Sequence, residues 1–256
     1  MAAYGMRPVF ELQFVDFFEP AWNQIVGNVS TLRWRSFGQW KCPMVIYAPY
    51  GAYLPGGSLW HSQSNEAYFA HTPGLKIAIP STPEDAAGLL WTAIQSDDPC
   101  FVFVPKHIFR KRVEVKDVQP LGFGKARVLK EGTDVTIVTW GNTLELAVEA
   151  AEKMAGQASV EIIDARSIVP FDYDTVTKSV EKTGRLIVIQ EDTKTCGMAE
   201  SIVANMVSVP ERFNLLLSPP QVVSRPDLHI GYNPIYEYAA LPDVDDVLAA
   251  IRVVMA

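Results

Sequence analysis

Short apolar segments with strand character alternate with helical patterns along this chain of 256 residues, and the alternation occurs twice. Such alternation is typical of parallel sheets that are covered by helices on both faces. Strands are predicted at 9–14, 43–47, 76–80, 100–104, 135–139, 160–164 and 185–189. Helices are predicted at about 20–36, 65–71, 81–95, 143–155, 173–182, 198–207 and 244–254. The sequence therefore predicts an α/β fold of two tandem α/β domains with mainly parallel sheets.

The segment 106–124 interrupts the alternation and separates the two regions. It is charged and contains Pro120, Gly122 and Gly124, a composition that favours a linker. Its short basic cluster from Lys106 to Arg112 is expected to be solvated. We place a first domain at 1–115, a linker at 116–128 and a second domain at 129–256.

The start of the chain resembles the end of a helix. Met1 to Gly5 reads as a last helical turn closed by a glycine, before a strand begins. A helix end without a helix start suggests that an N-terminal part is missing. The alternative is an unstructured start.

Composition argues against several classes of partner. The net charge is −7 and basic residues are not clustered over a surface-sized region, so nucleic acid is not an expected partner. No apolar run has the length needed to cross a membrane. The three cysteines lie far apart without zinc spacing, which favours reduced thiols in a cytosol-like compartment.

One loop stands out as a candidate for chemistry. Pro55-Gly-Gly-Ser-Leu-Trp-His61 uses two glycines to bring a histidine to the start of a helical pattern. Histidine is the side chain best suited to proton transfer near neutral pH, although a lone histidine can equally be one that packs or caps. The phosphate-binding glycine motifs and the GxSxG motif are absent, which argues against a self-contained nucleotide enzyme or a serine hydrolase.

Motifs along nearly the whole chain give a more specific indication. They include His61-Ser-Gln-Ser64, Pro73-Gly-Leu-Lys76, Pro80-Ser-Thr-Pro83, Ile162-Ile-Asp-Ala-Arg166 and Leu241-Pro-Asp243. In these the chain resembles the beta subunit of the thiamine-diphosphate-dependent decarboxylase component of 2-oxo acid dehydrogenase complexes, of the pyruvate or branched-chain type. The resemblance implies a partial pyrimidine-binding domain followed by a transketolase-type C-terminal domain.

The resemblance also implies cofactors, partners and a location. Thiamine diphosphate would be shared with a separate alpha subunit, which would hold the magnesium ion. Two alpha and two beta subunits would form a heterotetramer that docks on a lipoyl acyltransferase core. The reaction would be oxidative decarboxylation with acyl transfer to lipoyl groups, in the cytoplasm or, in a eukaryote, in the mitochondrial matrix.

Two residues match functional positions of that family. His61 corresponds to the active-site histidine, which exchanges protons with the oxygens and sulfurs of the reaction. Phe17 corresponds to the aromatic residue that stacks on the aminopyrimidine ring. The alternative for Phe17 is simple core packing beside Phe14 and Phe18.

A potassium site is also implied, through backbone carbonyls and an acidic side chain. The matching positions are Val45, Ala93, Ser96 and Asp98. Ser96 stands where the family usually has an aspartate, and a neutral serine weakens the charge balance for a cation.

The family's glutamate that activates the cofactor would lie just before Met1, outside this sequence. This keeps a non-catalytic assembly module open as an alternative function. Another enzyme of the transketolase superfamily is a further alternative, although such enzymes carry both cofactor halves on a much longer chain. The choice between pyruvate and branched-chain substrates stays open, with a slight preference for the branched-chain type.

Overall fold

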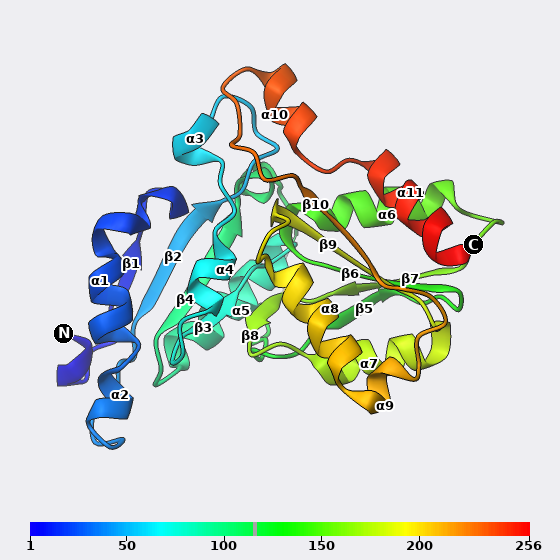
Figure 1. Ribbon diagram of the computed structural model, residues 1–256. Coiled ribbons are helices and arrows are strands. Elements are labelled where there is room, and N and C mark those ends of the chain that lie inside the picture. The colour runs from blue at the N-terminus through cyan, green and yellow to red at the C-terminus, as the bar shows by residue number, and fades with distance from the viewer. Residues whose placement is uncertain (115–116) are drawn as a thin grey trace.

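The computed structural model describes residues 1–114 and 117–256 and shows two five-stranded sheets with helices packed around them (Figure 1). This confirms the predicted fold of two α/β regions with mainly parallel sheets. The predicted boundary between residues 115 and 116 lies outside the described residues. No helix in the described part of the chain combines the length and the apolar character that a membrane crossing requires.

The first sheet has the strand order β1-β2-β4-β3-β8. Its first four strands pair in parallel, whereas β8 pairs antiparallel to β3 and comes from the second half of the chain. β1 is an edge strand whose three residues are exposed. The strands are β1 (Val9–Glu11), β2 (Val45–Tyr50), β3 (Lys76–Ala78), β4 (Cys100–Pro105) and β8 (Ser167–Val169).

The second sheet has the order β10-β9-β6-β7-β5, in which only β5 runs antiparallel to its neighbour. Every residue of β6 and β7 is buried, as expected for central parallel strands that are covered on both faces. The strands are β5 (Arg127–Lys130), β6 (Val135–Thr139), β7 (Val160–Asp164), β9 (Leu186–Thr193) and β10 (Gln221–Arg225).

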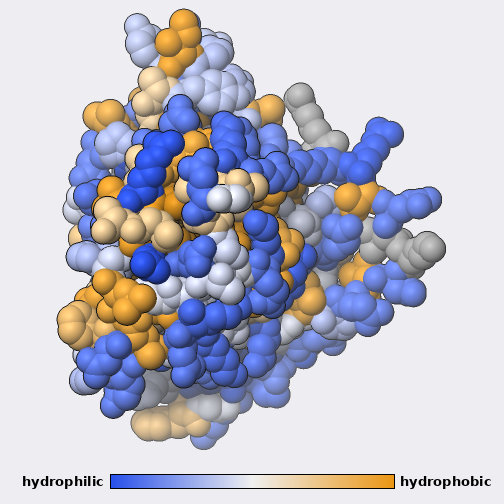
Figure 2. All heavy atoms as spheres, turned by 90° about the vertical axis from the view of Figure 1, so that its right-hand side faces the viewer, coloured by the Kyte–Doolittle hydropathy of each residue, from blue (hydrophilic) through white to orange (hydrophobic). Residues whose placement is uncertain are grey.

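Helices cover the second sheet on both faces. α7 (Tyr173–Thr183) and α8 (Met198–Ser208) share one apolar core with buried residues of the first sheet. α6 (Leu144–Lys153) and α11 (Val244–Met255) form a separate core on the opposite face. The outer side of that layer is mainly hydrophilic, with scattered apolar patches (Figure 2). The remaining α-helices are α3 (Ser58–His61), α4 (Glu66–Ala70), α5 (Pro83–Gln95), α9 (Pro210–Phe213) and α10 (Pro234–Ala240).

The helix predicted at 20–36 is a helical stretch of changing type. It consists of the 3-10 helix η2 (Val15–Ala21), α1 (Trp22–Gln24), the π-helical turn η3 (Ile25–Val29) and α2 (Leu32–Arg35). Ser30 and Thr31 donate side-chain hydrogen bonds back to the carbonyls of Val26 and Gly27. Such bonds compete with the regular helical ladder and accompany the local change of helix type.

Two expectations about local structure have clear outcomes. Ala2–Tyr4 forms a 3-10 turn that is closed by Gly5 with a positive φ of 89°, which agrees with the predicted glycine-closed turn. Lys106 was expected in a solvated segment, but only 5% of its surface is exposed, because it continues directly from the buried strand β4. All three cysteines are free thiols.

Candidate functional site

His61 ends the short helix α3, and the backbone before it depends on glycine. Gly56 has a φ of +100°, a conformation that other residues rarely adopt. A Cβ atom on Gly57 would lie 2.0 Å from Ser62 Oγ and 3.1 Å from the His61 carbonyl oxygen, so a side chain here would require its neighbours to shift. The two glycines therefore allow the tight turn that presents His61.

The half-buried imidazole of His61 is oriented by a hydrogen bond within its own turn. Its Nδ1 lies 3.2 Å from the carbonyl oxygen of Gly57. Because a carbonyl oxygen can only accept, Nδ1 is the donor here, which leaves Nε2 as the nitrogen for proton exchange.

Two phenylalanine rings from the start of η2 flank the imidazole. The centroids of the Phe14 and Phe17 rings lie 4.3 and 5.4 Å from that of His61, and both contacts are edge-on. Phe18 is buried in the core, but 41% of Phe17 is exposed. Core packing therefore does not account for Phe17, whose ring remains available to a flat ligand.

Asp16 holds the backbone that follows His61. One oxygen of its carboxylate accepts a hydrogen bond from the backbone N–H of Gln63 at 2.9 Å. Its other oxygen is buried and has no hydrogen-bond partner among the described residues. Burial raises the pKa of Asp16, while the charges of Lys106 and His61 act against the rise.

Buried acids connect this loop region to the second sheet. Glu66, at the start of α4, accepts hydrogen bonds from Tyr50 Oη at 2.5 Å and from Trp140 Nε1 at 3.0 Å. Burial raises the pKa of Glu66 to about 7, and the charge of Asp192 adds to the rise. Glu66 thus links the first sheet, through Tyr50, to the second, through Trp140.

Glu191 on β9 makes a second connection. Its carboxylate accepts hydrogen bonds from the backbone N–H of Ala52 and, at 2.7 Å, from the side chain of Asn142. The backbone at Gly51 has a φ of +79°, and a Cβ there would lie 2.7 Å from the Glu191 carboxylate. The glycine allows the loop to approach the acid closely.

Two large cavities differ in their relation to His61. One of about 830 Å³ lies beside the His61 turn between the two sheets; its lining includes Asp16, Trp60, Gln63, Asp192 and Arg225. A larger, mainly apolar cavity of about 1340 Å³ runs along α1, η3 and α2, and its lining includes Trp22, Val26 and Trp34. We place the candidate site beside the smaller cavity, because Trp60 and Gln63 on either side of His61 in the sequence line it, whereas His61 and Phe17 themselves do not.

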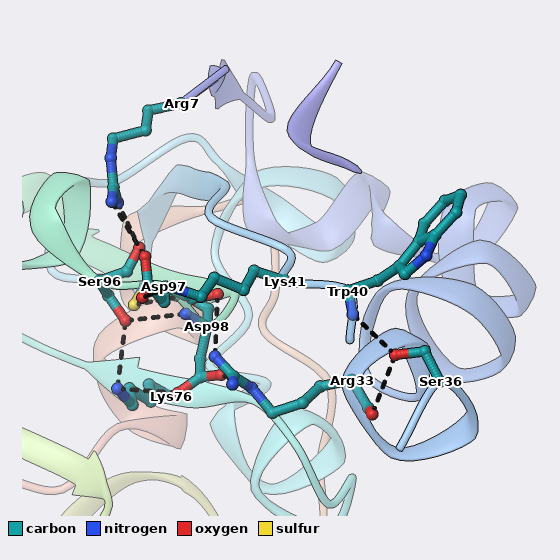
Figure 3. A network of polar contacts seen from close by, with 10 residues as sticks. Arg7, Arg33, Ser36, Trp40, Lys41, Lys76, Ser96, Asp97 and Asp98 are labelled. Carbon is teal, nitrogen blue, oxygen red and sulfur yellow. Dashed lines mark hydrogen bonds and ion pairs between the residues drawn. The ribbon is translucent and has the colours of Figure 1, made fainter. Parts of the chain in front are cut away.

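The four positions implied for potassium lie near one another. Val45 and Ala93 pack in the same small core, while Ser96 and Asp98 follow α5 in the turn before β4. Figure 3 shows that side-chain cations surround this turn. Arg7 donates to the Ser96 carbonyl oxygen at 2.6 Å, and Lys76 Nζ lies 3.1 Å from Ser96 Oγ.

The aspartates of the same turn are also paired with cations. Arg33 Nε donates to Asp98 at 2.6 Å, and Lys76 lies 3.3 Å from the other Asp98 oxygen. Asp97 is paired with Arg7 and Lys41, and hydrogen bonds from these two cations lower its pKa. Two of the four implied ligand positions, the Ser96 carbonyl and the Asp98 carboxylate, are therefore already bonded to guanidinium and ammonium groups.

Comparison with known proteins identifies the family. Residues 1–111 match the transketolase pyrimidine binding domain and residues 124–247 match the transketolase C-terminal domain. Over 98% of its length the chain is 41% identical to the 2-oxoisovalerate dehydrogenase subunit beta of Bacillus subtilis and covers 77% of that protein. The chain belongs to the family of 2-oxo acid dehydrogenase beta subunits. The family resemblance seen in the sequence is thereby confirmed.

Other relatives agree with this assignment. The mitochondrial 2-oxoisovalerate dehydrogenase subunit beta of Dictyostelium discoideum is 45% identical over 86% of the chain, which spans 60% of that relative's length. The pyruvate dehydrogenase E1 component subunit beta of Rickettsia bellii is 37% identical over 97% of the chain and 76% of the relative. A split-gene transketolase, solved as an inactive beta4 tetramer, has the same fold with a TM-score of 0.80 over 99% of this chain and 77% of its own, at 21% identity.

Several residues of the site were not predicted from the sequence. Asp16 and Lys106 lie 45 or more positions from the residues whose backbone they hold, so spacing along the chain carries no sign of the contact. Glu66 gave a weak signal, since it lies two residues after the last residue of the HSQS motif and begins a short helix. His61 and Phe17, which were predicted, do lie together.

Proposed function

We propose that this chain supplies the pyrimidine-side half of a thiamine diphosphate site and acts in oxidative decarboxylation of a 2-oxo acid with a separate alpha subunit. The observation that carries the proposal is the oriented His61 imidazole beside the exposed ring of Phe17. A partly exposed aromatic ring next to a histidine suits a flat heteroaromatic ligand whose substrate exchanges protons.

Each residue has a distinct part in the proposed site. Phe17 presents its ring to the aminopyrimidine. His61 Nε2 exchanges a proton with the oxygen of the substrate and with the incoming lipoyl sulfur, while the Gly57 carbonyl fixes the tautomer. When bound, thiamine diphosphate supplies the nucleophilic carbon and the electron sink for loss of carbon dioxide.

The proposal also includes the partners of the chain. The alpha subunit would hold the diphosphate and its magnesium ion, and two copies of each subunit would form the heterotetramer. The assembly would dock on a lipoyl acyltransferase core that receives the acyl group. Among the substrates we favour branched-chain 2-oxo acids, because the relatives named for 2-oxoisovalerate are 38–45% identical and those named for pyruvate are 36–37% identical.

The test is decarboxylation by the chain mixed with a 2-oxoisovalerate dehydrogenase alpha subunit, thiamine diphosphate and magnesium, with an artificial electron acceptor. We expect turnover only when both subunits are present, and a higher kcat/KM for 2-oxoisovalerate than for pyruvate. A mixture that assembles but shows no cofactor-dependent turnover would contradict the enzymatic proposal and favour the assembly module. Preference for pyruvate would contradict the substrate assignment alone.

A further inference from the structure

Lys106 places a buried ammonium group against the backbone of the His61 turn. It follows the last residue of β4 and begins the 3-10 helix η4 (Lys106–Arg110), and only 5% of its surface is exposed. Lysine is rarely buried to this extent without partners, because removing an ammonium group from water is costly.

The ammonium group holds the backbone of the turn. Lys106 Nζ donates hydrogen bonds to the carbonyl oxygen of His61 and, at 3.2 Å, to Ser62 Oγ. A Cβ on Gly57 would lie 2.9 Å from the same nitrogen, so the ammonium group sits inside the turn. Lys106 therefore bonds to the end of the segment that presents the imidazole and lies close to its start at Gly57.

Acids from both halves of the chain influence the pKa of Lys106. Burial lowers the pKa of Lys106, and the charges of Glu237, Glu191 and Asp16 act against the fall. Asp16 belongs to η2, while Glu191 lies on β9 and Glu237 on α10. Among the described residues the direct partners of the Lys106 ammonium group are the His61 carbonyl oxygen and Ser62 Oγ, and no carboxylate lies within ion-pair distance of it.

Glu237 is the most distinctive of these acids. It is completely buried, and neither of its carboxylate oxygens has a hydrogen-bond partner among the described residues. Burial raises its pKa, while the charge of Lys106 and the nearby backbone N–H groups of Gly56, Leu54 and Tyr53 oppose the rise. Glu237 thus faces the backbone of residues 53–56, which leads into the His61 turn.

We propose that Lys106 is a positioning residue that fixes the His61 turn through its hydrogen bonds to the His61 carbonyl oxygen and Ser62 Oγ. This inference rests on the proposed function in taking His61 as the working group. It adds a residue that touches neither the proposed substrate nor the cofactor, and that acts through the backbone of His61.

The first experiment measures the turn itself in the full chain. Lys106→Met removes the charge and keeps the length of the side chain, Lys106→Arg keeps the charge, and Lys153→Met on the exposed face of α6 is the matched control. Amide exchange of residues 57–64 is followed by mass spectrometry. The four histidines give ring NMR signals, of which that of His61 is assigned with His61→Asn.

We expect exchange at residues 57–64 to increase about tenfold or more in Lys106→Met and the His61 signal to shift, while the His71 and His229 signals stay in place. Lys106→Arg should recover most of the protection, and Lys153→Met should match the unmodified chain. A folded Lys106→Met variant with unchanged exchange and an unchanged His61 signal would overturn the proposal. A general loosening that shifts all four histidine signals would also overturn it, because it would indicate a merely structural role.

A second variant covers the case in which Lys106→Met does not fold. Ser62→Ala removes one of the two acceptors and leaves the charge in place. Its exchange at residues 57–64 should rise, and an unchanged rate would overturn the proposal. These readouts need no turnover, so a His61 that is dispensable for decarboxylation would refute the proposed function without touching the positioning role.

Discussion

Glu66 illustrates how a single buried residue couples the site to solution pH. Its carboxylate lies between Tyr50 and Trp140 without exposure to solvent, and its pKa is raised to about 7 from an ordinary value of 4.5. The protonated form is therefore favoured in the folded chain relative to the unfolded chain.

The first prediction concerns stability against pH. Because the folded pKa of Glu66 exceeds its unfolded value, its stabilising contribution is full below about pH 4.5 and is lost as the pH rises through about 7. The loss is on the order of 3 kcal/mol, measured as the free energy of unfolding by urea. Glu66→Gln should flatten this decline.

Some decline should persist in that variant, because burial also raises the pKa of Asp164 and of Asp192 to about 6. Glu149→Gln, on the exposed surface of α6, is the matched control and should keep the full decline. An equal decline in Glu66→Gln and in the unmodified chain would refute the assignment.

The sequence was informative about residues whose motif is local. The glycines and the histidine of the loop are adjacent in sequence, so the turn and its imidazole could be predicted. Lys106 was misplaced in the solvated linker, because its neighbours are charged and only the course of β4 determines that it points inward. The same limit applies to Asp16, whose acceptor role depends on a contact 47 residues away.

At the scale of elements, the turn between α5 and β4 is held by side-chain cations. Arg7 comes from the segment before β1, Arg33 from α2 and Lys76 from β3, and all three meet this turn (Figure 3). The turn therefore ties together elements from across the first half of the chain, through groups that are about one-third exposed.

The second prediction follows from this arrangement. The midpoint of thermal unfolding should be equal in potassium chloride and in sodium chloride at the same ionic strength, because ammonium and guanidinium groups already bond to the oxygens of the turn. Lys76→Met should lower the free energy of unfolding by no more than about 1 kcal/mol, since the lost pair is partly exposed. A stabilisation of several degrees specific to potassium would show that the ion binds here after all.

Helices and strands were predictable where their pattern of apolar residues extended over many positions. The strands of the predicted parallel core were recovered, but β5, β8, β10, α3, α9 and α10 were missed. β8 has three residues, and it joins the sheet of the other half of the chain, so its partner cannot be deduced from local pattern. β5 precedes a buried strand but carries three exposed residues, which hides the alternation that would identify it.

At the scale of the whole molecule, the two sheets do not form independent halves. One apolar core contains buried residues from both, and β8 adds the second half of the chain to the first sheet. Ser81 donates to the buried Asp164 at 2.7 Å and accepts from the Gly141 N–H at 2.9 Å, which adds polar links across the same boundary.

The third prediction is that the chain unfolds in a single cooperative transition. Separation of the halves would expose shared apolar surface and leave the buried groups Glu66, Glu191 and Asp164 without their partners. Differential scanning calorimetry should give equal calorimetric and van't Hoff enthalpies. Two resolved transitions would mean that the shared core contributes little.

The central claim is that His61 is the proton-transferring residue of a site completed by an alpha subunit. The most direct test compares His61→Asn with His71→Asn in the assembled complex; His71 is exposed at the end of α4 and serves as the matched control. The account predicts that kcat falls by about 100-fold or more in His61→Asn and stays near the unmodified value in His71→Asn. Equal rates in the two variants, with assembly and cofactor binding intact, would contradict it.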